Sequence, residues 1–119
     1  MSEPDSDRLA RKAAVLCLAK KAHEVCLMDL RGLTGMTDFF VICHGDSDVQ
    51  VQAIADSVLE GIQKEGIRVW HCEGYEHRNW ILLDCVDVVV HIFKKEERTF
   101  YNLERLWGDA PTAMVQDSA

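Results

Sequence analysis

"RNWILLDCVDVVVHIF", residues 78–93, is the stretch that decides the fold of this chain. It predicts two β-strands joined by a tight turn around Cys85 and Val86, because apolar and β-branched residues fill both halves. Side chains alternate between the two faces of a strand, so the hairpin has two unlike faces. One face is wholly apolar and holds Ile81, Leu83, Val88, Val90 and Ile92. The other face is mixed and holds Trp80, Leu82, Asp84, Asp87, Val89, His91 and Phe93.

The turn sets the register of this hairpin. A two-residue loop of Cys85 and Val86 fixes which residues stand opposite one another. The expected pairs are Asp84 with Asp87, Leu82 with Val89, and Trp80 with His91. Carboxylates are costly in a dry core without partners. We therefore expect the apolar face to pack on helices and the mixed face to look outward.

The acids and the histidine of the mixed face raise the question of a metal or acid–base site. Asp87 and His91 are four residues apart on one strand, about 13 Å at the usual rise, which is too far for two ligands of one ion. The Asp84–Asp87 pair could hold a cation or share a proton, or it could simply form the turn. We expect no catalytic residue, no metal and no cofactor.

Trp80 and Leu82 lie two residues apart and point the same way from one strand. They are either ordinary core beneath the C-terminal helix or an exposed binding platform. A tryptophan ringed by acids has the composition of an interface aimed at a basic partner. Tyr101 and Glu104 on the last helix either extend this platform or form a solvated helix face. The candidate partner-binding residues are Trp80, Leu82, Asp84, Asp87, His91, Tyr101 and Glu104.

Around the hairpin the chain alternates between helix and strand patterns. Helices are expected over residues 5–23, 47–66 and 96–108, and further strands over 24–30, 38–44 and 67–72. Ser47 and Gln50 have the spacing of a helix-capping box, and Gly66 suits the residue after a helix. The order α-β-β-α-β-β-β-α predicts a single α/β (α+β) domain over residues 1–111, with a mixed sheet and helices mainly on one face. Residues 112–119 are expected to form a flexible C-terminal tail.

Composition narrows the class of protein. Thirteen Lys and Arg stand against 20 Asp and Glu in 119 residues, a net charge of −7, which disfavours direct binding to nucleic acid. The start of the chain lacks the apolar centre of a signal peptide, and no apolar run is long enough for a membrane span. The five cysteines form no C-x-x-C pair, and His71, Cys72 and His77 match no zinc-binding spacing. We expect buried, reduced thiols and a cytoplasmic protein that does not bind membranes.

Three longer pieces of the chain resemble the Iojap family, the ribosomal silencing factors. They are "DLRGLTGMTDFFVICHGDSDVQVQAIAD" (29–56), "WILLDCVDVVVHIF" (80–93) and "RTFYNLERLW" (98–107). The resemblance covers nearly everything from Glu24 to Trp107 in matching order and spacing. It implies a fold similar to a degenerate nucleotidyltransferase domain, since "HGDS" (44–47) precedes a helix as in that superfamily. Asp84 and Asp87 lack the alternating spacing of that superfamily's metal-binding acids, so no enzymatic activity is expected.

The resemblance also implies a function. Family members bind the large ribosomal subunit through its protein number fourteen and block joining of the small subunit, which represses translation when nutrients are scarce. The alternatives are an assembly factor of the large subunit, or a nucleotide- or metal-dependent enzyme of the nucleotidyltransferase type. The free protein could be a monomer or a homodimer, and the sequence does not decide between them. The family usually has Gly where this chain has Val86; a β-branched residue at positive φ is strained, so we expect a wider turn or one that needs no positive φ.

Overall fold

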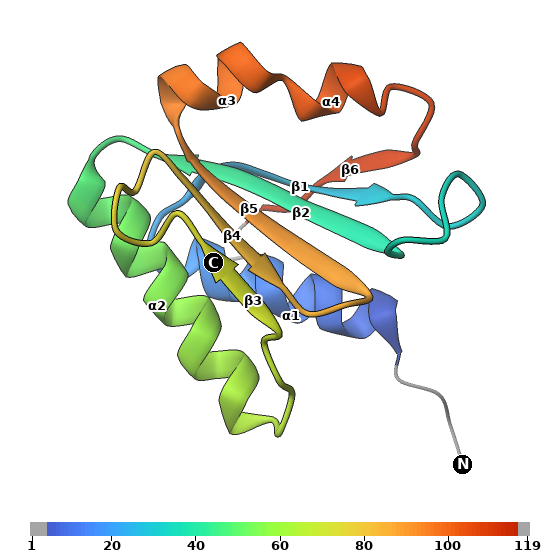
Figure 1. Ribbon diagram of the computed structural model, residues 1–119, viewed down its shortest axis with the longest axis horizontal. Helices are drawn as coiled ribbons and strands as arrows, with labels where there is room; N and C mark the ends of the chain where they lie inside the picture. The colour runs from blue at the N-terminus through green and yellow to red at the C-terminus, as the bar shows by residue number, and fades with distance from the viewer. Residues whose placement is uncertain (1–4, 117–119) are drawn as a thin grey trace.

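The computed structural model describes residues 5–116, which form a six-stranded mixed sheet between two layers of helices (Figure 1). The helices are α1 (Ser6–Leu18), α2 (Asp48–Lys64), α3 (Lys95–Tyr101) and α4 (Leu103–Leu106). The strands are β1 (His23–Asp29), β2 (Phe39–Gly45), β3 (His71–Glu73), β4 (Trp80–Asp84), β5 (Val88–Lys94) and β6 (Thr112–Met114). Their order across the sheet is β3-β4-β5-β2-β1-β6, and only β2 and β5 pair in parallel. The predicted α/β domain with a mixed sheet is confirmed.

The two long helices, α1 and α2, cover one face of the sheet (Figure 1). This is the apolar face of the hairpin: Ile81, Leu83 and Val90 are fully buried in the cluster beneath these helices. The alternation of apolar residues in the hairpin therefore predicted correctly which face packs on the helices. Within residues 5–116, no helix is both long and apolar enough to span a bilayer.

Local capping explains where α2 begins and ends. The Ser47 hydroxyl accepts a hydrogen bond from the Gln50 amide, 3.1 Å away, as the capping box predicted. Gly66 follows the helix with φ at 76°, a conformation that glycine adopts without strain. α1 is shorter than predicted: it ends at Leu18 because the chain turns at Lys21, with φ at 63°, and enters β1.

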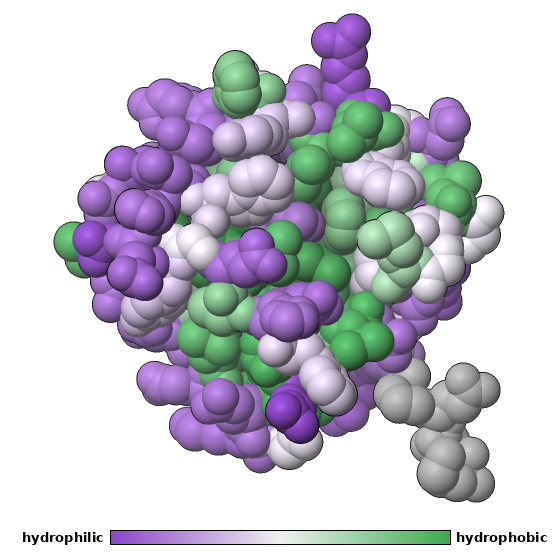
Figure 2. Space-filling model, viewed as in Figure 1, coloured by the Kyte–Doolittle hydropathy of each residue, from purple (hydrophilic) through white to green (hydrophobic). Residues whose placement is uncertain are grey.

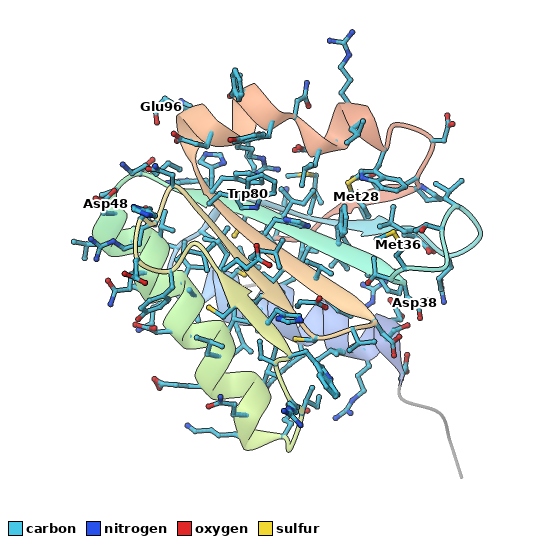
Figure 3. The ribbon with its side chains drawn as sticks, in the orientation of Figure 1. Met28, Met36, Asp38, Asp48, Trp80 and Glu96 are labelled. Carbon is cyan, nitrogen blue, oxygen red and sulfur yellow. The ribbon has the colours of Figure 1, made fainter. Side chains whose placement is uncertain are left out.

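The second helical layer, α3 and α4, lies on the opposite face of the sheet (Figure 1). One continuous helix was expected here, but it is broken at Asn102, where φ is 46°. The Asn102 side chain caps α4 by accepting from the Arg105 amide at 3.3 Å. A second apolar cluster fills the space below: Cys26, Met28, Leu30, Ile42, Phe93, Leu103 and Ala110. Met28 lies beneath α4 (Figure 3). The helices therefore lie mainly, but not wholly, on one face.

The hairpin turn differs from the predicted one. The two loop residues are Val86 and Asp87, because the Cys85 amide donates to the Val88 carbonyl at 2.9 Å. The strands are therefore offset by two residues from the prediction, and Leu82 stands opposite His91. An even offset keeps each side chain on its predicted face.

Val86 itself has φ at 72°, so the expectation of a wider turn, or one without positive φ, is wrong. The Asp87 amide donates to the Cys85 carbonyl at 2.9 Å, which makes Val86 the centre of a tight three-residue turn. The Asp84 carboxylate accepts from the Val86 amide at 2.8 Å. These bonds hold a β-branched residue in a conformation that it disfavours.

The expected flexible tail is wrong for Thr112–Met114, which form β6 and pair antiparallel with β1. The Asp29 amide donates to the Pro111 carbonyl, and the Val115 amide to the Val25 carbonyl, at 2.8 Å each. Backbone pairing along the free edge of β1 thus orders a segment whose composition resembles a loop. Residues 117–119 of the predicted tail lie outside the described residues.

All five cysteines lie in the described part of the chain as free thiols. Four are buried, as expected, whereas Cys72 is exposed because β3 is an edge strand.

Candidate partner-binding face

Part of the mixed face of the sheet, along β3, β4 and the start of β5, is left uncovered by α3 and α4. Register and alternation place five side chains there: His71, Glu73, Leu82, Asp84 and Val89. We call these five residues the open face. Its apolar members are half-buried, and the two residues from β3 are exposed. Figure 2 shows this side of the molecule, where apolar side chains are interrupted by hydrophilic ones over the region of β4 and β5. A surface of this kind suits binding to another protein.

Trp80 lies at the border between the open face and α3 (Figure 3). Its ring is stacked on Phe93 with 4.8 Å between centroids, and lies 4.6 Å from the ring of Tyr101. Its indole N–H donates to Nδ1 of His91 at 3.1 Å. Trp80 therefore packs beside the last helices, as the core interpretation expected, and it is only partly buried. Its role in binding a partner stays a prediction.

His91 was expected to look outward, and this is wrong: its side chain is buried. It lies between Trp80 and Phe40, with 4.4 Å between the centroids of the histidine and phenylalanine rings. Burial lowers the pKa of His91 to about 3. The imidazole is therefore neutral, and because Nδ1 accepts from Trp80, the proton is on Nε2. Nε2 finds no hydrogen-bond acceptor among the described residues.

The two acids of the turn do not form a metal site with His91. Asp84 uses its carboxylate on the Val86 amide and stands opposite Val89 in the register. Asp87 lies in the turn, and its carbonyl accepts from the amides of the two residues that lead into β2. Across residues 5–116, no three His, Cys, Asp or Glu side chains come together in a group that could hold a metal ion. Asp84 instead stands opposite His71 on the open face and Glu73 stands opposite Leu82, so two carboxylates flank its apolar side chains.

Glu104, a predicted partner-binding residue, is engaged within the chain. Its Oε2 accepts from Nη2 and Nε of Arg98, at 2.8 and 3.1 Å. Arg98 is buried and also donates to Nδ1 of His44 at 3.0 Å and to the His23 carbonyl at 3.2 Å. Arg98 is not among the residues predicted from the sequence to form the site. The signal was available, because an arginine three residues before Tyr101 shares the sheet-facing side of the same helix.

The comparisons with known proteins agree with the fold. A family described as "Ribosomal silencing factor during starvation" matches residues 3–119. The "Ribosomal silencing factor RsfS" of Halalkalibacterium halodurans is 50% identical over 97 residues, which cover 82% of this chain and 83% of the relative. "Protein Iojap, chloroplastic" of Zea mays is 37% identical over 113 residues, which cover 91% of this chain and 49% of the relative.

A solved structure is also similar. A crystal structure of a protein from Bacillus halodurans superposes with a TM-score of 0.81 at 44% identity, and the match covers 92% of this chain and 99% of that one.

Proposed function

This chain belongs to the ribosomal silencing factor family, and from that premise we propose that it binds the large ribosomal subunit through the subunit's protein number fourteen. Bound there, it blocks joining of the small subunit and so represses translation when nutrients are scarce. The site of action is cytoplasmic. The observation that carries the proposal is the open face, where half-buried apolar side chains on the sheet are flanked by the carboxylates of Glu73 and Asp84.

The open face has the properties that binding of a basic protein requires. Leu82 and Val89 supply apolar area that a partner could remove from water. Glu73, Asp84 and Asp87 can pair with lysine or arginine at the rim of the contact. A net charge of −7 repels the phosphates of ribosomal RNA. This combination favours a ribosomal protein over RNA as the partner.

The mechanism needs no chemistry from this chain. A rigid domain on the joining surface of the large subunit excludes the small subunit by occupying the same volume. The amount of silencing then follows the fraction of large subunits that carry the factor. We therefore assign no catalytic residue and no cofactor.

Two measurements test the proposal. Purified protein should migrate with free large subunits in a sucrose gradient, and it should reduce the formation of joined ribosomes in proportion to its occupancy. Protein that stays at the top of the gradient would refute binding. Binding to immature subunits alone would favour an assembly factor instead.

A matched pair of variants tests the surface. Leu82→Glu places an unpaired carboxylate in the centre of the open face, whereas Val15→Glu does so on the exposed side of α1, across the sheet. Only the first should lose co-migration with the large subunit. Equal behaviour of the two variants would place the contact elsewhere.

A further inference from the structure

α3 and α4 are too short to hold their own position. They have seven and four residues, well below the length at which a helix is stable by itself in water. Asn102 breaks the chain direction between them with a left-handed conformation. The angle between the two helices, and their place on the sheet, must therefore come from side-chain contacts.

Arg98 supplies contacts in four directions from one side chain. It joins α3 to α4 through the carboxylate of Glu104, at 2.8 Å. It joins α3 to β1 through the His23 carbonyl and to β2 through Nδ1 of His44. Its Nη2 also lies 3.8 Å from Sγ of Cys26. A planar guanidinium can satisfy partners in fixed directions, which an ammonium cannot.

Because an arginine N–H can only donate, Nδ1 of His44 must be an acceptor. His44 is therefore neutral where it meets Arg98, with its proton on Nε2, 3.9 Å from the Glu24 carboxylate. Burial and the neighbouring Arg98 charge lower the pKa of His44. The arginine thus lies in a site prepared for one cation, with the carboxylate of Glu104 as its counter-charge.

This arrangement controls the border of the open face. Tyr101 lies three residues after Arg98 on the same helix, and its ring contacts Trp80 at 4.6 Å and Phe93 at 6.3 Å between centroids. The opposite end of α3 is continuous with β5. If Arg98 releases its partners, the C-terminal half of α3 is free to swing from the sheet, and Tyr101 leaves Trp80.

We infer that Arg98 is a positioning residue for partner binding: it fixes α3 and α4 on β1 and β2 and thereby keeps Tyr101 against Trp80 at the edge of the open face. Arg98 is buried and does not itself touch the partner. The inference rests on the proposed function, since the partner-binding surface is the one described there.

The test compares Arg98→Ala, Arg98→Lys and Glu104→Gln with Arg105→Ala as the matched control. Arg105 lies on α4 with an exposed side chain that makes no hydrogen bond or ion pair to any residue between 5 and 116. The first measurement is the nuclear Overhauser effect between the Trp80 and Tyr101 rings in the free protein. The second is the affinity for purified large ribosomal subunits.

Arg98→Ala should lose the Trp80–Tyr101 signal, keep the signals of the core beneath α1 and α2, and bind at least about tenfold more weakly. Arg98→Lys keeps the positive charge but loses the planar guanidinium, so its Trp80–Tyr101 signal and its affinity for the subunit should lie between those of Arg98→Ala and the wild type. Glu104→Gln should give intermediate values as well. Arg105→Ala should match the wild type. If Arg98→Ala does not fold, the ring signal and the affinity of Arg98→Lys and Glu104→Gln are compared with those of Arg105→Ala instead.

Two results would overturn the inference. One is normal binding by a variant that has lost the ring contact; the other is weakened binding by a variant that retains it. If the wild-type protein itself does not bind large subunits, the proposed function fails, and the loss of the ring contact on Arg98→Ala then decides only whether Arg98 positions the helices.

Discussion

Trp80 donates its indole N–H to Nδ1 of His91, and this bond links the edge of the open face to its buried interior. The bond selects one tautomer of the histidine and one orientation of the tryptophan. Replacing Trp80 by alanine would remove ring packing as well as any contact with a partner. Leu82 has neither this hydrogen bond nor this ring packing, so a substitution there is the better test of binding.

Leu82→Glu should weaken binding to the large subunit by at least about 2 kcal/mol, roughly thirtyfold, while the melting temperature changes little. The reason is that Leu82 is only half-buried, so its loss costs the fold less than it costs a dry interface. Gradient co-migration and thermal melting measure the two effects separately. A variant that melts early and binds poorly would instead make Leu82 part of the core.

His91 should make the protein sensitive to acid. Its pKa in the folded protein is about 3, below the ordinary value of about 6.5. Between pH 3 and pH 6.5 the unfolded chain therefore binds a proton at His91 that the folded protein does not bind. The contribution of neutral His91 to the free energy of unfolding is complete above pH 6.5 and is lost progressively as the pH falls toward 3. At pH 5 the loss is about 2 kcal/mol.

His91→Gln should remove this part of the pH dependence, because an amide does not titrate. Urea unfolding of both proteins at pH 7 and pH 5 checks it, and the difference between them cancels the carboxylates that titrate in the same range. Parallel pH profiles for the two proteins would show that His91 is solvated rather than buried.

The rate of association should depend on salt. Glu73 and Asp84 on the open face steer a basic partner before contact, so raising salt from about 50 to 500 mM should slow association at least about tenfold and change dissociation little. Glu73→Lys should reduce both the rate at low salt and its salt dependence. Stopped-flow mixing with large subunits gives the rates; an association rate that ignores salt would exclude steering by these acids.

Val86→Gly should stabilise the domain by about 1 kcal/mol, because glycine relieves the positive φ while the exposed valine gives up little buried area. Val49→Gly is the control: this valine is exposed in the first turn of α2, where glycine should cost about 0.5–1 kcal/mol. Chemical denaturation measures both changes. If both variants lose stability, the turn holds Val86 without strain.

Local patterns predicted most of the fold. The cap at Ser47 and the glycine at position 66 depend on a few neighbouring residues, and both are found where the pattern placed them. The two faces of the hairpin follow from alternation alone, so they survive even though the register was misjudged. The register was misjudged because the loop was placed at Cys85 and Val86, whereas the hydrogen bond from the Cys85 amide to the Val88 carbonyl makes Val86 and Asp87 the loop residues.

Properties that depend on distant segments were harder to predict. His91 is buried because α3 and α4 fold back over it, and no pattern within β5 reveals a helix on that side. Arg98 has four partners from three other elements, which only the assembled structure brings together. β6 forms because β1 offers an unpaired edge, although the central residue of β6, Ala113, has little strand propensity.

β6 also has a consequence for anyone who shortens this chain. The sequence suggests residue 111 as the end of the domain, because residues 112–119 resemble a tail. A protein that ended there would lose the strand that pairs with Cys26, Leu27 and Met28. Three apolar residues would then stand along an open sheet edge, which is a template for pairing with a second molecule. A truncated protein should therefore aggregate on concentration, and light scattering before and after removal of residues 112–119 would reveal it.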